Sequence, residues 1–419
     1  MQFRKIPVNR NKTERVLIME QLEDKNNFQE GLIHTLESVP LYTMNNQFHR
    51  YMAIIKQQCG KRIFPGIGFS MDYHVARQYA VGEAIERYCA GIMNPTDIVN
   101  QTMSELKYRS ISPAHFNRYT KEQYAAQHRF EEFDEKKERN WVLANNYMTE
   151  EKVYLPFETV YLLIPEHHKT FRDVVSTGLA SGPCFDVAFE NALNECIEKD
   201  AFMLFWLLKK VNFEISLNSI KTTRINKLIE TVESLNYSIQ IYDISQPDIK
   251  SFTILTVLKA KDSKGFYMAA STNRKLNKAI KKSIEEAISG YVTLQEKGDY
   301  QSETGDQTAN EDSVYYYFQG HDDEALTEVL TPQGDLQELS SIEQEYTFTE
   351  MIHSVANQTD IFYKDLTSDD IKELNLKSLR VVTPSLLILP YEKVALLESS
   401  RLQKLANGAE LNPKPHPYP

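Results

Sequence analysis

The sequence GFSMDYHVARQYAVGEAIERY, residues 68–88, is the stretch that decides the fold of this 419-residue chain. Alanines and other apolar residues recur in it near helical spacing, and a glycine and a proline follow, so we expect a helix over about residues 74–91. Within this helix, Glu83 and Glu86 stand three positions apart. That spacing places two carboxylates one turn apart on one face of the helix.

A second helix repeats the arrangement. The sequence STGLASGPCFDVAFENALNECIEKDAF, residues 176–202, predicts a glycine-bearing loop and then a long, largely buried helix over about residues 186–209. Glu195 and Glu198 have the same spacing as the first pair. Like charges at this spacing repel each other, and the cost rises on burial unless a cation compensates them.

Four carboxylates on two helices that face each other form an oxygen-only cage, which suits Mg²⁺. A ferritin-like di-iron site requires E-x-x-H pairs, and neither helix has one. Either pair alone is also consistent with the solvated face of a surface helix. Because the two pairs match, we favour a metal site.

Composition and charge limit the class of protein. Hydrophobic residues make up 42% and charged residues 25% of the chain, which is typical of a soluble globular protein. The net charge of −11 argues against a nucleic-acid partner. No apolar run reaches the length of a membrane span, and the first residues lack a signal-peptide core. The cysteines are unclustered, so we expect a cytoplasmic protein without a membrane partner.

Several residue types that often bind ligands have plainer interpretations here. Cys89 and Cys196 lie in helical apolar patterns and are expected to be buried thiols. The adjacent histidines at 167–168 are expected in a solvated loop, and the mixed-sign stretch at residues 131–139 on a solvated face. Trp141 and Trp206 fit core positions.

The remaining pattern alternates strands and helices and indicates a mixed α/β fold. Hairpins are expected over residues 141–164 and 252–271, and a helix over about residues 273–296. The domain organisation expected is an N-terminal segment (1–60), one main domain (61–400) with a flexible loop at 298–313, and a C-terminal tail (401–419). The tail ends in NPKPHPYP and should be extended and stiff.

The two glutamate motifs, followed by AIKKSIEEAISGY at residues 279–291, resemble the three signatures of YcaO proteins and occur in the order of that family. The resemblance covers about residues 60–400. It implies the YcaO fold, with an ATP site between the helices that bear the E-x-x-E motifs and mixed β-sheets. It also implies ATP and Mg²⁺ as cofactors, bound without a Walker loop.

The resemblance assigns roles residue by residue. The metal ligands that it implies are Glu83, Glu86, Glu195 and Glu198. The groups that it implies around the nucleotide are Arg87, Asn191, Lys199, Lys282 and Glu286. The sequence departs from the family pattern at Ile67, Tyr79, Lys199 and Lys282. Because lysine lacks the bidentate fork of arginine, we expect weaker or rearranged phosphate contacts.

The tail selects a subfamily. Pro415, Pro417 and Pro419 match the P-x-P-x-P ending of YcaO proteins that make azolines. There the tail brings its terminal carboxylate into the active site, which implies that the Pro419 carboxylate is a proton acceptor. The alternatives are a disordered proline-rich tail or a linker to a partner; we expect the chain to stop on this proline, which argues against a linker.

The implied activity is an ATP-dependent cyclodehydratase that converts Cys, Ser or Thr of a ribosomal precursor peptide to thiazoline or oxazoline, as in bacteriocin and antibiotic biosynthesis. We expect no leader-binding domain in this chain. The resemblance then implies an E1-like or ThiF-like partner that binds the leader peptide, and an FMN-dependent dehydrogenase that aromatises the ring; a homodimer is one further arrangement. The alternative functions are a YcaO thioamide or amidine synthase and a degenerate YcaO that serves as a scaffold or allosteric subunit.

Overall fold

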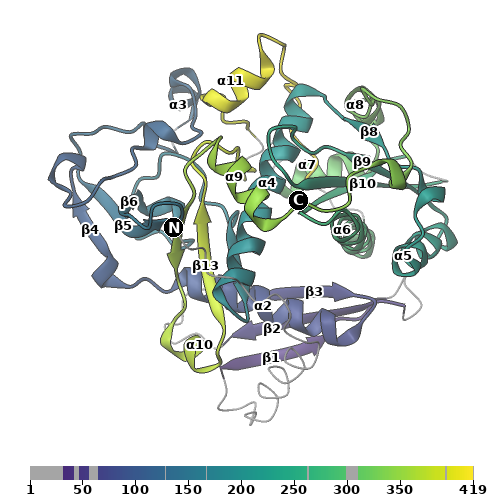
Figure 1. The fold of residues 1–419 in the computed structure, drawn as a ribbon, viewed down its shortest axis with the longest axis horizontal. Coiled ribbons are helices and arrows are strands. Elements are labelled where there is room, and N and C mark those ends of the chain that lie inside the picture. The colour runs from purple at the N-terminus through teal and green to yellow at the C-terminus, as the bar shows by residue number, and fades with distance from the viewer. Residues whose placement is uncertain are drawn as a thin grey trace.

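Three antiparallel sheets and the helices between them form the molecule in this computed structural model (Figure 1). The structure describes residues 32–41, 47–55, 65–127, 129–166, 168–261, 264–298, 310–391 and 394–418. The predicted mixed α/β class is confirmed. Among the described residues, no helix is long and apolar enough to cross a membrane.

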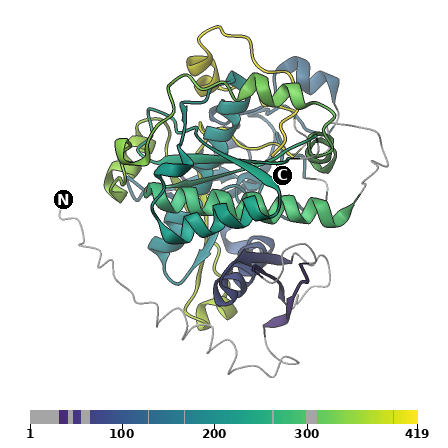
Figure 2. The ribbon, with the colours of Figure 1, turned by 90° about the vertical axis from the view of Figure 1, so that its right-hand side faces the viewer.

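The first sheet has the order β1-β2-β3 and is covered on one face by helix α2 (Figure 2). Its elements are β1 (Ile33–Ser38), β2 (His49–Ile55), β3 (Gly66–Ser70) and α2 (Tyr73–Gly91). A Cβ atom on Gly66 would lie 2.0 Å from the carbonyl oxygen of Ala80, and one on Gly68 would lie 1.8 Å from that of Ala76. The resemblance to YcaO proteins implies a glycine loop at residues 66–68, before the first glutamate pair, and the structure contradicts this expectation. This segment is a strand, and its glycines let the backbone approach α2 closely.

The second sheet has the order β4-β5-β12-β13-β7, and β6 pairs with β5. Its strands are β4 (Ile98–Gln101), β5 (Arg139–Asn146), β6 (Lys152–Pro156), β7 (Leu179–Gly182), β12 (Phe362–Asp365) and β13 (Lys377–Val382). The predicted hairpin is present, but its second strand ends at Pro156, where a 3₁₀ turn begins. A proline lacks the N–H that would continue the ladder. The second glycine loop also continues as a strand, β7.

The third sheet has the order β11-β10-β9-β8. Its strands are β8 (Phe213–Glu214), β9 (Tyr237–Asp243), β10 (Phe252–Ala260) and β11 (Tyr267–Asn273). The long helix α4 (Phe185–Leu208) contacts both this sheet and the second sheet, so it runs through the centre of the molecule (Figure 1). Helices α5 (Thr223–Ser234) and α6 (Leu276–Lys297) pack on the third sheet. The second half of α4 is buried all round, as predicted.

The shorter helices cover the ends of the sheets. They are α3 (Lys121–Ala126), α7 (Asn310–Phe318), α8 (Asp323–Val329), α9 (Phe348–Ala356), α10 (Asp369–Glu373) and α11 (Ser400–Ala406). The flexible loop expected at 298–313 lies mostly outside the described residues, and its last positions already belong to α7. Residues 411–418 form no helix or strand, in agreement with the predicted extended tail.

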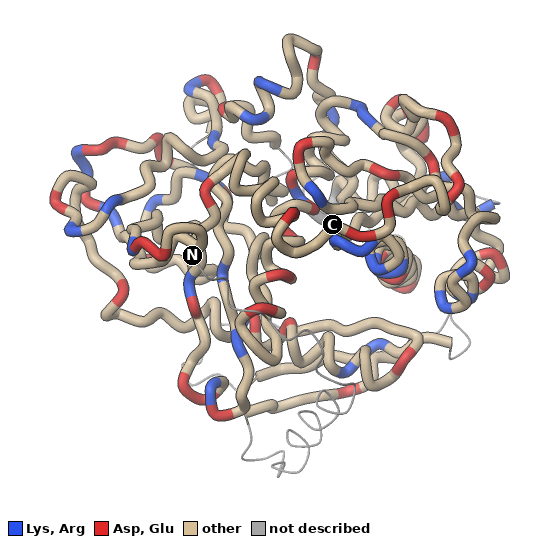
Figure 3. The backbone as a smooth tube through the Cα atoms, in the orientation of Figure 1, with Lys and Arg blue, Asp and Glu red and all other residues tan. Residues whose placement is uncertain are grey.

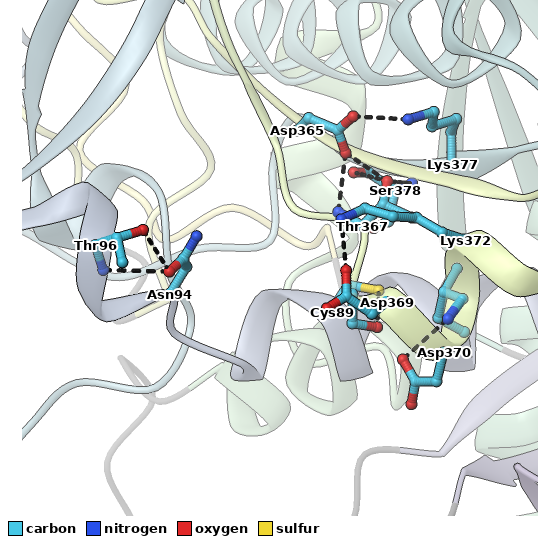
Figure 4. A network of polar contacts seen from close by, with 12 residues as sticks. Cys89, Asn94, Thr96, Asp365, Thr367, Asp369, Asp370, Lys372, Lys377 and Ser378 are labelled. Carbon is cyan, nitrogen blue, oxygen red and sulfur yellow. Dashed lines mark hydrogen bonds and ion pairs between the residues drawn. The ribbon is translucent and has the colours of Figure 1, made fainter.

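A polar network holds the C-terminal end of α2 in place (Figure 4). The Tyr88 hydroxyl donates to Asp370 of α10 at 2.6 Å, and the buried Cys89 thiol lies 3.7 Å from the hydroxyl of Ser368. Asp365 in turn accepts hydrogen bonds from the N–H of Thr367 at 2.9 Å and from Lys377 at 2.9 Å. The β12–β13 connection therefore fixes the helix that presents the first glutamate pair.

Candidate active site

Helices α2, α4 and α6 bring the predicted site residues together. Acidic positions of α2 and α4 gather near the centre of the molecule, beside the basic positions of α6 (Figure 3). Glu86 of α2 interacts electrostatically with Glu195 of α4, and Glu198 of α4 interacts with Lys282 of α6. The two E-x-x-E motifs therefore face one site, as the sequence predicts.

Glu86 and Glu195 are the under-compensated carboxylates of this site. Burial raises the pKa of Glu86 well above its ordinary value, and the charges of Glu195 and Glu83 raise it further. Burial likewise raises the pKa of Glu195 to about 7, although the cation of Lys199 opposes this shift. The N–H of Gly178 donates to Glu195 at 3.3 Å. A divalent cation would satisfy both groups better than the protein alone does.

Glu83 and Glu198 are held by donors from the protein. Glu83 accepts from the guanidinium of Arg87 at 2.6 Å and from the N–H of Ile67 at 2.5 Å. Glu198 accepts at Oε1 from Lys199 at 2.8 Å and at Oε2 from the N–H of Thr272 at 3.2 Å. Burial alone would raise the pKa of Glu198, but Lys199 and Lys282 lower it below the ordinary value.

The donor set fits a hard divalent cation. All four groups are carboxylates, and Mg²⁺ prefers oxygen ligands and retains substrate phosphates in its shell. Within the described part of the chain, no group of three or more acidic, histidine or cysteine side chains is already arranged to hold a metal ion. Two of the four glutamates are turned toward the neighbouring cations Arg87 and Lys199 instead. A metal ion bound by all four would therefore share Glu83 and Glu198 with these cations, through the lone-pair positions that remain open.

Helix α6 contains the K-x-x-x-E pattern in two registers. Lys282 and Glu286 form an ion pair of 3.0 Å, and both interact electrostatically with Glu198. Their side chains remain 55% and 38% exposed, so solvent reaches this pair. In the other register, Lys281 pairs with the buried Glu285. The register predicted from the sequence is the one that faces the glutamates of α4.

The other predicted site residues are Asn191 and the three prolines of the tail, and the structure places only some of them near the glutamates. Asn191 lies one turn before Glu195 and is exposed, and its side chain forms no hydrogen bond with the described residues. The tail does enter the site: Pro417 is buried, and the carbonyl of Pro415 accepts from Tyr317 at 2.9 Å. Pro419 lies outside the described residues, so its role as a base stays a prediction.

Two residues of the site, Tyr418 and Arg380, are not among those predicted from the sequence. The Tyr418 hydroxyl contacts Glu198 at 2.9 Å and Lys199 at 3.2 Å. Arg380 of β13 donates to three backbone carbonyls and lies near Glu86 and Glu195. A signal was present for Arg380, because it is the one charged residue in the apolar stretch SLRVV (378–382) and is 4% exposed.

The structure contradicts the solvated position expected for His168 and adds a feature beside the stretch at residues 131–139. His168 is not solvated, because its side chain is 6% exposed and its Nε2 lies 3.3 Å from the buried carboxylate of Glu158. The mixed-sign stretch at 131–139 borders a cavity of about 330 Å³ that none of the predicted site residues lines. Trp141, Trp206, Cys89 and Cys196 are buried, as predicted.

Comparison with known proteins now identifies the family. Residues 67–387 match the family described as YcaO cyclodehydratase, ATP- and Mg²⁺-binding. The chain belongs to the YcaO cyclodehydratase family. The match confirms the predicted family and, through the description of the family, the predicted cofactors ATP and Mg²⁺.

Among curated proteins, the YcaO chain is similar to the microcin B17-processing protein McbD of Escherichia coli, with 29% identity over 131 residues. That alignment covers 30% of this chain and spans about a third (33%) of the length of the relative.

Solved structures of similar fold include a heterocyclase in complex with substrate and cofactor, with 17% identity and a TM-score of 0.78 over 96% of this chain and 57% of that one. They also include the YcaO protein of Methanopyrus kandleri bound with AMPPCP and Mg²⁺, with 15% identity and a TM-score of 0.65 over 97% of this chain and 96% of that one. A chain of the E. coli microcin synthetase McbBCD complex with pro-MccB17 bound has 18% identity and a TM-score of 0.65, over 92% and 96% of the two chains. At these identities the structures show the fold, which is the predicted YcaO fold.

Proposed function

We propose that this YcaO chain is an ATP-dependent cyclodehydratase that converts Cys, Ser or Thr residues of a ribosomal precursor peptide to azolines. The observation that supports it best is the meeting of four elements at one site. Helices α2 and α4 contribute the glutamates, α6 contributes the Lys282–Glu286 pair, and residues 415–418 enter beside them. The similarity to McbD and to the heterocyclase structures agrees with this activity.

In the proposed reaction, a side-chain thiol or hydroxyl of the peptide attacks the carbon of the preceding backbone carbonyl. The carbonyl oxygen then takes the γ-phosphoryl group of ATP and leaves as phosphate when the ring nitrogen forms the C=N bond. ATP and Mg²⁺ supply the phosphoryl group and neutralise its charge. The peptide supplies the nucleophile, so the protein needs no Ser-His-Asp or Cys-His arrangement.

In this proposal, the residues of the chain position the metal ion and the nucleotide and neutralise the charge of the phosphates. Glu86 and Glu195 face each other with raised pKa values and are the groups that gain most from a divalent cation. Arg87 and Lys282 lie beside the glutamates of α2 and α4, which supports the proposal that they contact phosphate oxygens. Catalysis of this kind depends on positioning and charge neutralisation rather than on a covalent enzyme intermediate.

The proposed partners follow from the same activity. An E1-like or ThiF-like protein would deliver the leader peptide, and an FMN-dependent dehydrogenase would oxidise the azoline to an azole. The structure similar to this chain comes from a complex named McbBCD, in which pro-MccB17 is bound. A cytoplasmic location stays a prediction from the composition.

The test is ring formation by the purified chain, together with its E1-like partner, the precursor peptide, ATP and Mg²⁺, followed by mass spectrometry. We expect the loss of one water per ring, a fall of at least about 100-fold with Glu195→Gln, and little change with Glu230→Gln on the exposed face of α5. Full ring formation by Glu195→Gln would support the scaffold alternative. Exchange of oxygen for sulfur in the peptide would support the thioamide alternative.

A further inference from the structure

We propose that Tyr418 is a positioning residue of the metal site: its hydroxyl holds the carboxylate of Glu198 in the orientation that binds Mg²⁺. The inference rests on the proposed function, because it takes Glu198 as a ligand of the metal ion that accompanies ATP. Tyr418 lies outside the predicted P-x-P-x-P residues, and none of the three glutamate or lysine motifs points to it.

The segment that bears Tyr418 is fixed through its backbone. The indole N–H of Trp206 donates to the carbonyl of Lys414 at 2.8 Å, the Tyr317 hydroxyl donates to that of Pro415 at 2.9 Å, and the Ser313 hydroxyl donates to that of His416 at 3.1 Å. These bonds do not depend on the side chain at position 418. Removal of the Tyr418 hydroxyl should therefore leave the segment in place.

The side chain of Tyr418 packs against α4, the helix that bears Glu198. Its ring packs against Phe202, with 4.4 Å between the ring centroids, and the ammonium of Lys199 lies 4.3 Å from the ring centroid. Its hydroxyl oxygen lies 2.9 Å from Oε1 of Glu198 and 3.2 Å from the carbonyl of Ala270. The shorter contact to a charged acceptor is the stronger one, so the hydroxyl donates to Glu198.

Together with Lys199 and Thr272, this bond fixes the direction of the Glu198 carboxylate. Oε1 accepts from Tyr418 and Lys199, and Oε2 accepts from the N–H of Thr272 at 3.2 Å. An ionised carboxylate offers about four lone-pair positions, so about one remains for a metal ion. Hydrogen bonds of this kind to metal ligands typically change metal affinity by about 10- to 100-fold when they are removed.

The experiment compares two buried tyrosines whose hydroxyls form hydrogen bonds in the region of the C-terminal tail. Tyr418→Phe removes the bond to Glu198, whereas Tyr317→Phe removes a tail bond that does not reach Glu198. The quantity measured is the Mg²⁺ concentration that gives half-maximal binding of AMPPCP, by calorimetry. We expect a rise of about 10-fold for Tyr418→Phe, with binding restored at high Mg²⁺, and less than about twofold for Tyr317→Phe.

A second readout separates positioning from a loss of structure. The chain has two tryptophans, so in a Trp141→Phe background the fluorescence of Trp206 reports on the adjacent Lys414 carbonyl. We expect Tyr418→Phe to leave this fluorescence unchanged. An equal shift of the Mg²⁺ requirement in both tyrosine variants, or none in Tyr418→Phe, would overturn the inference.

Glu198→Gln distinguishes a failure of the inference from a failure of the proposed function. If Glu198→Gln raises the Mg²⁺ requirement and Tyr418→Phe does not, Glu198 is a ligand but Tyr418 does not position it. If neither Glu198→Gln nor Glu195→Gln changes the Mg²⁺ requirement, the glutamates do not hold the metal ion, and the proposed function fails together with the inference.

Discussion

Glu158 and Glu195 are both carboxylates surrounded by protein, but their environments shift their pKa values in opposite directions. Glu158 is fully buried, but Arg139, His168 and the N–H of Phe171 all donate to it. Burial alone would raise its pKa, and these partners hold the pKa below the ordinary value. Glu195 has Glu198 and Glu86 as neighbours, and its pKa rises to about 7 because nearby cations offset the effect of burial only in part.

The comparison distinguishes a structural carboxylate from a functional one. Glu158, which the fold has already satisfied with a guanidinium, a histidine and a backbone N–H, contributes stability and has little affinity left for a metal ion. A carboxylate that the fold leaves short of positive charge lowers the stability of the metal-free protein and gains when a cation arrives. The predictions below test this distinction, beginning with the largest expected effect.

The largest effect on stability is expected at the satisfied carboxylate. Glu158→Gln removes the charge that compensates Arg139, so the free energy of unfolding should fall by about 3 kcal/mol in urea titrations. The exposed pair Glu151–Arg109 provides the control, and Glu151→Gln should change stability by less than about 0.5 kcal/mol. Equal losses in both variants would show that the buried partners of Glu158 add no more stability than an exposed ion pair does.

A smaller effect of opposite sign is expected at Glu195. Its folded-state pKa of about 7 exceeds the ordinary value of 4.5, so unfolding releases a proton between these values and stability falls as the pH rises through this window. Without Mg²⁺, Glu195→Gln should therefore be more stable than the wild type above about pH 7, by on the order of 1 kcal/mol. The difference should shrink toward about pH 4.5, as urea titrations across the pH range would show. A Glu195→Gln protein less stable than the wild type at high pH would contradict the account.

The smallest effect is expected at the α6 cation. Lys282 is half exposed and pairs with Glu286. Lys282→Arg restores a planar fork that can contact two phosphate oxygens, so the affinity for AMPPCP with Mg²⁺ should rise by about two- to fourfold. Lys281→Arg, in the register that pairs with buried Glu285, should not raise it. An unchanged affinity in Lys282→Arg would show that this side chain does not contact the phosphates, and a loss would contradict the expected second contact.

The sequence predicted the helices well because their signals are local. Helical spacing located α2 and α4 within one or two residues, and the order of the motifs led to the family. Strands β3 and β7 were taken for loops because glycine usually marks a turn, whereas Gly66 and Gly68 serve the contact with α2. That contact depends on residues eight or more positions away, so no local pattern reveals it.

The same limit applies to the site. The four glutamates and the Lys282–Glu286 pair could be proposed from the sequence because each motif is contained within one or two helical turns. Tyr418 and Glu198 are 220 positions apart, and the burial of Glu158 against Arg139 and His168 joins three separate segments. Whether a given carboxylate is satisfied is decided by such distant partners, and composition or spacing alone does not indicate it.

The most direct test of the central claim is a calorimetric titration of AMPPCP into the wild type, Glu195→Gln and Glu230→Gln, each with and without Mg²⁺. The account predicts Mg²⁺-dependent binding by the wild type and Glu230→Gln, and binding at least about 10-fold weaker by Glu195→Gln. Equal, Mg²⁺-dependent binding by all three proteins would contradict the claim that the facing glutamates of α2 and α4 hold the metal ion.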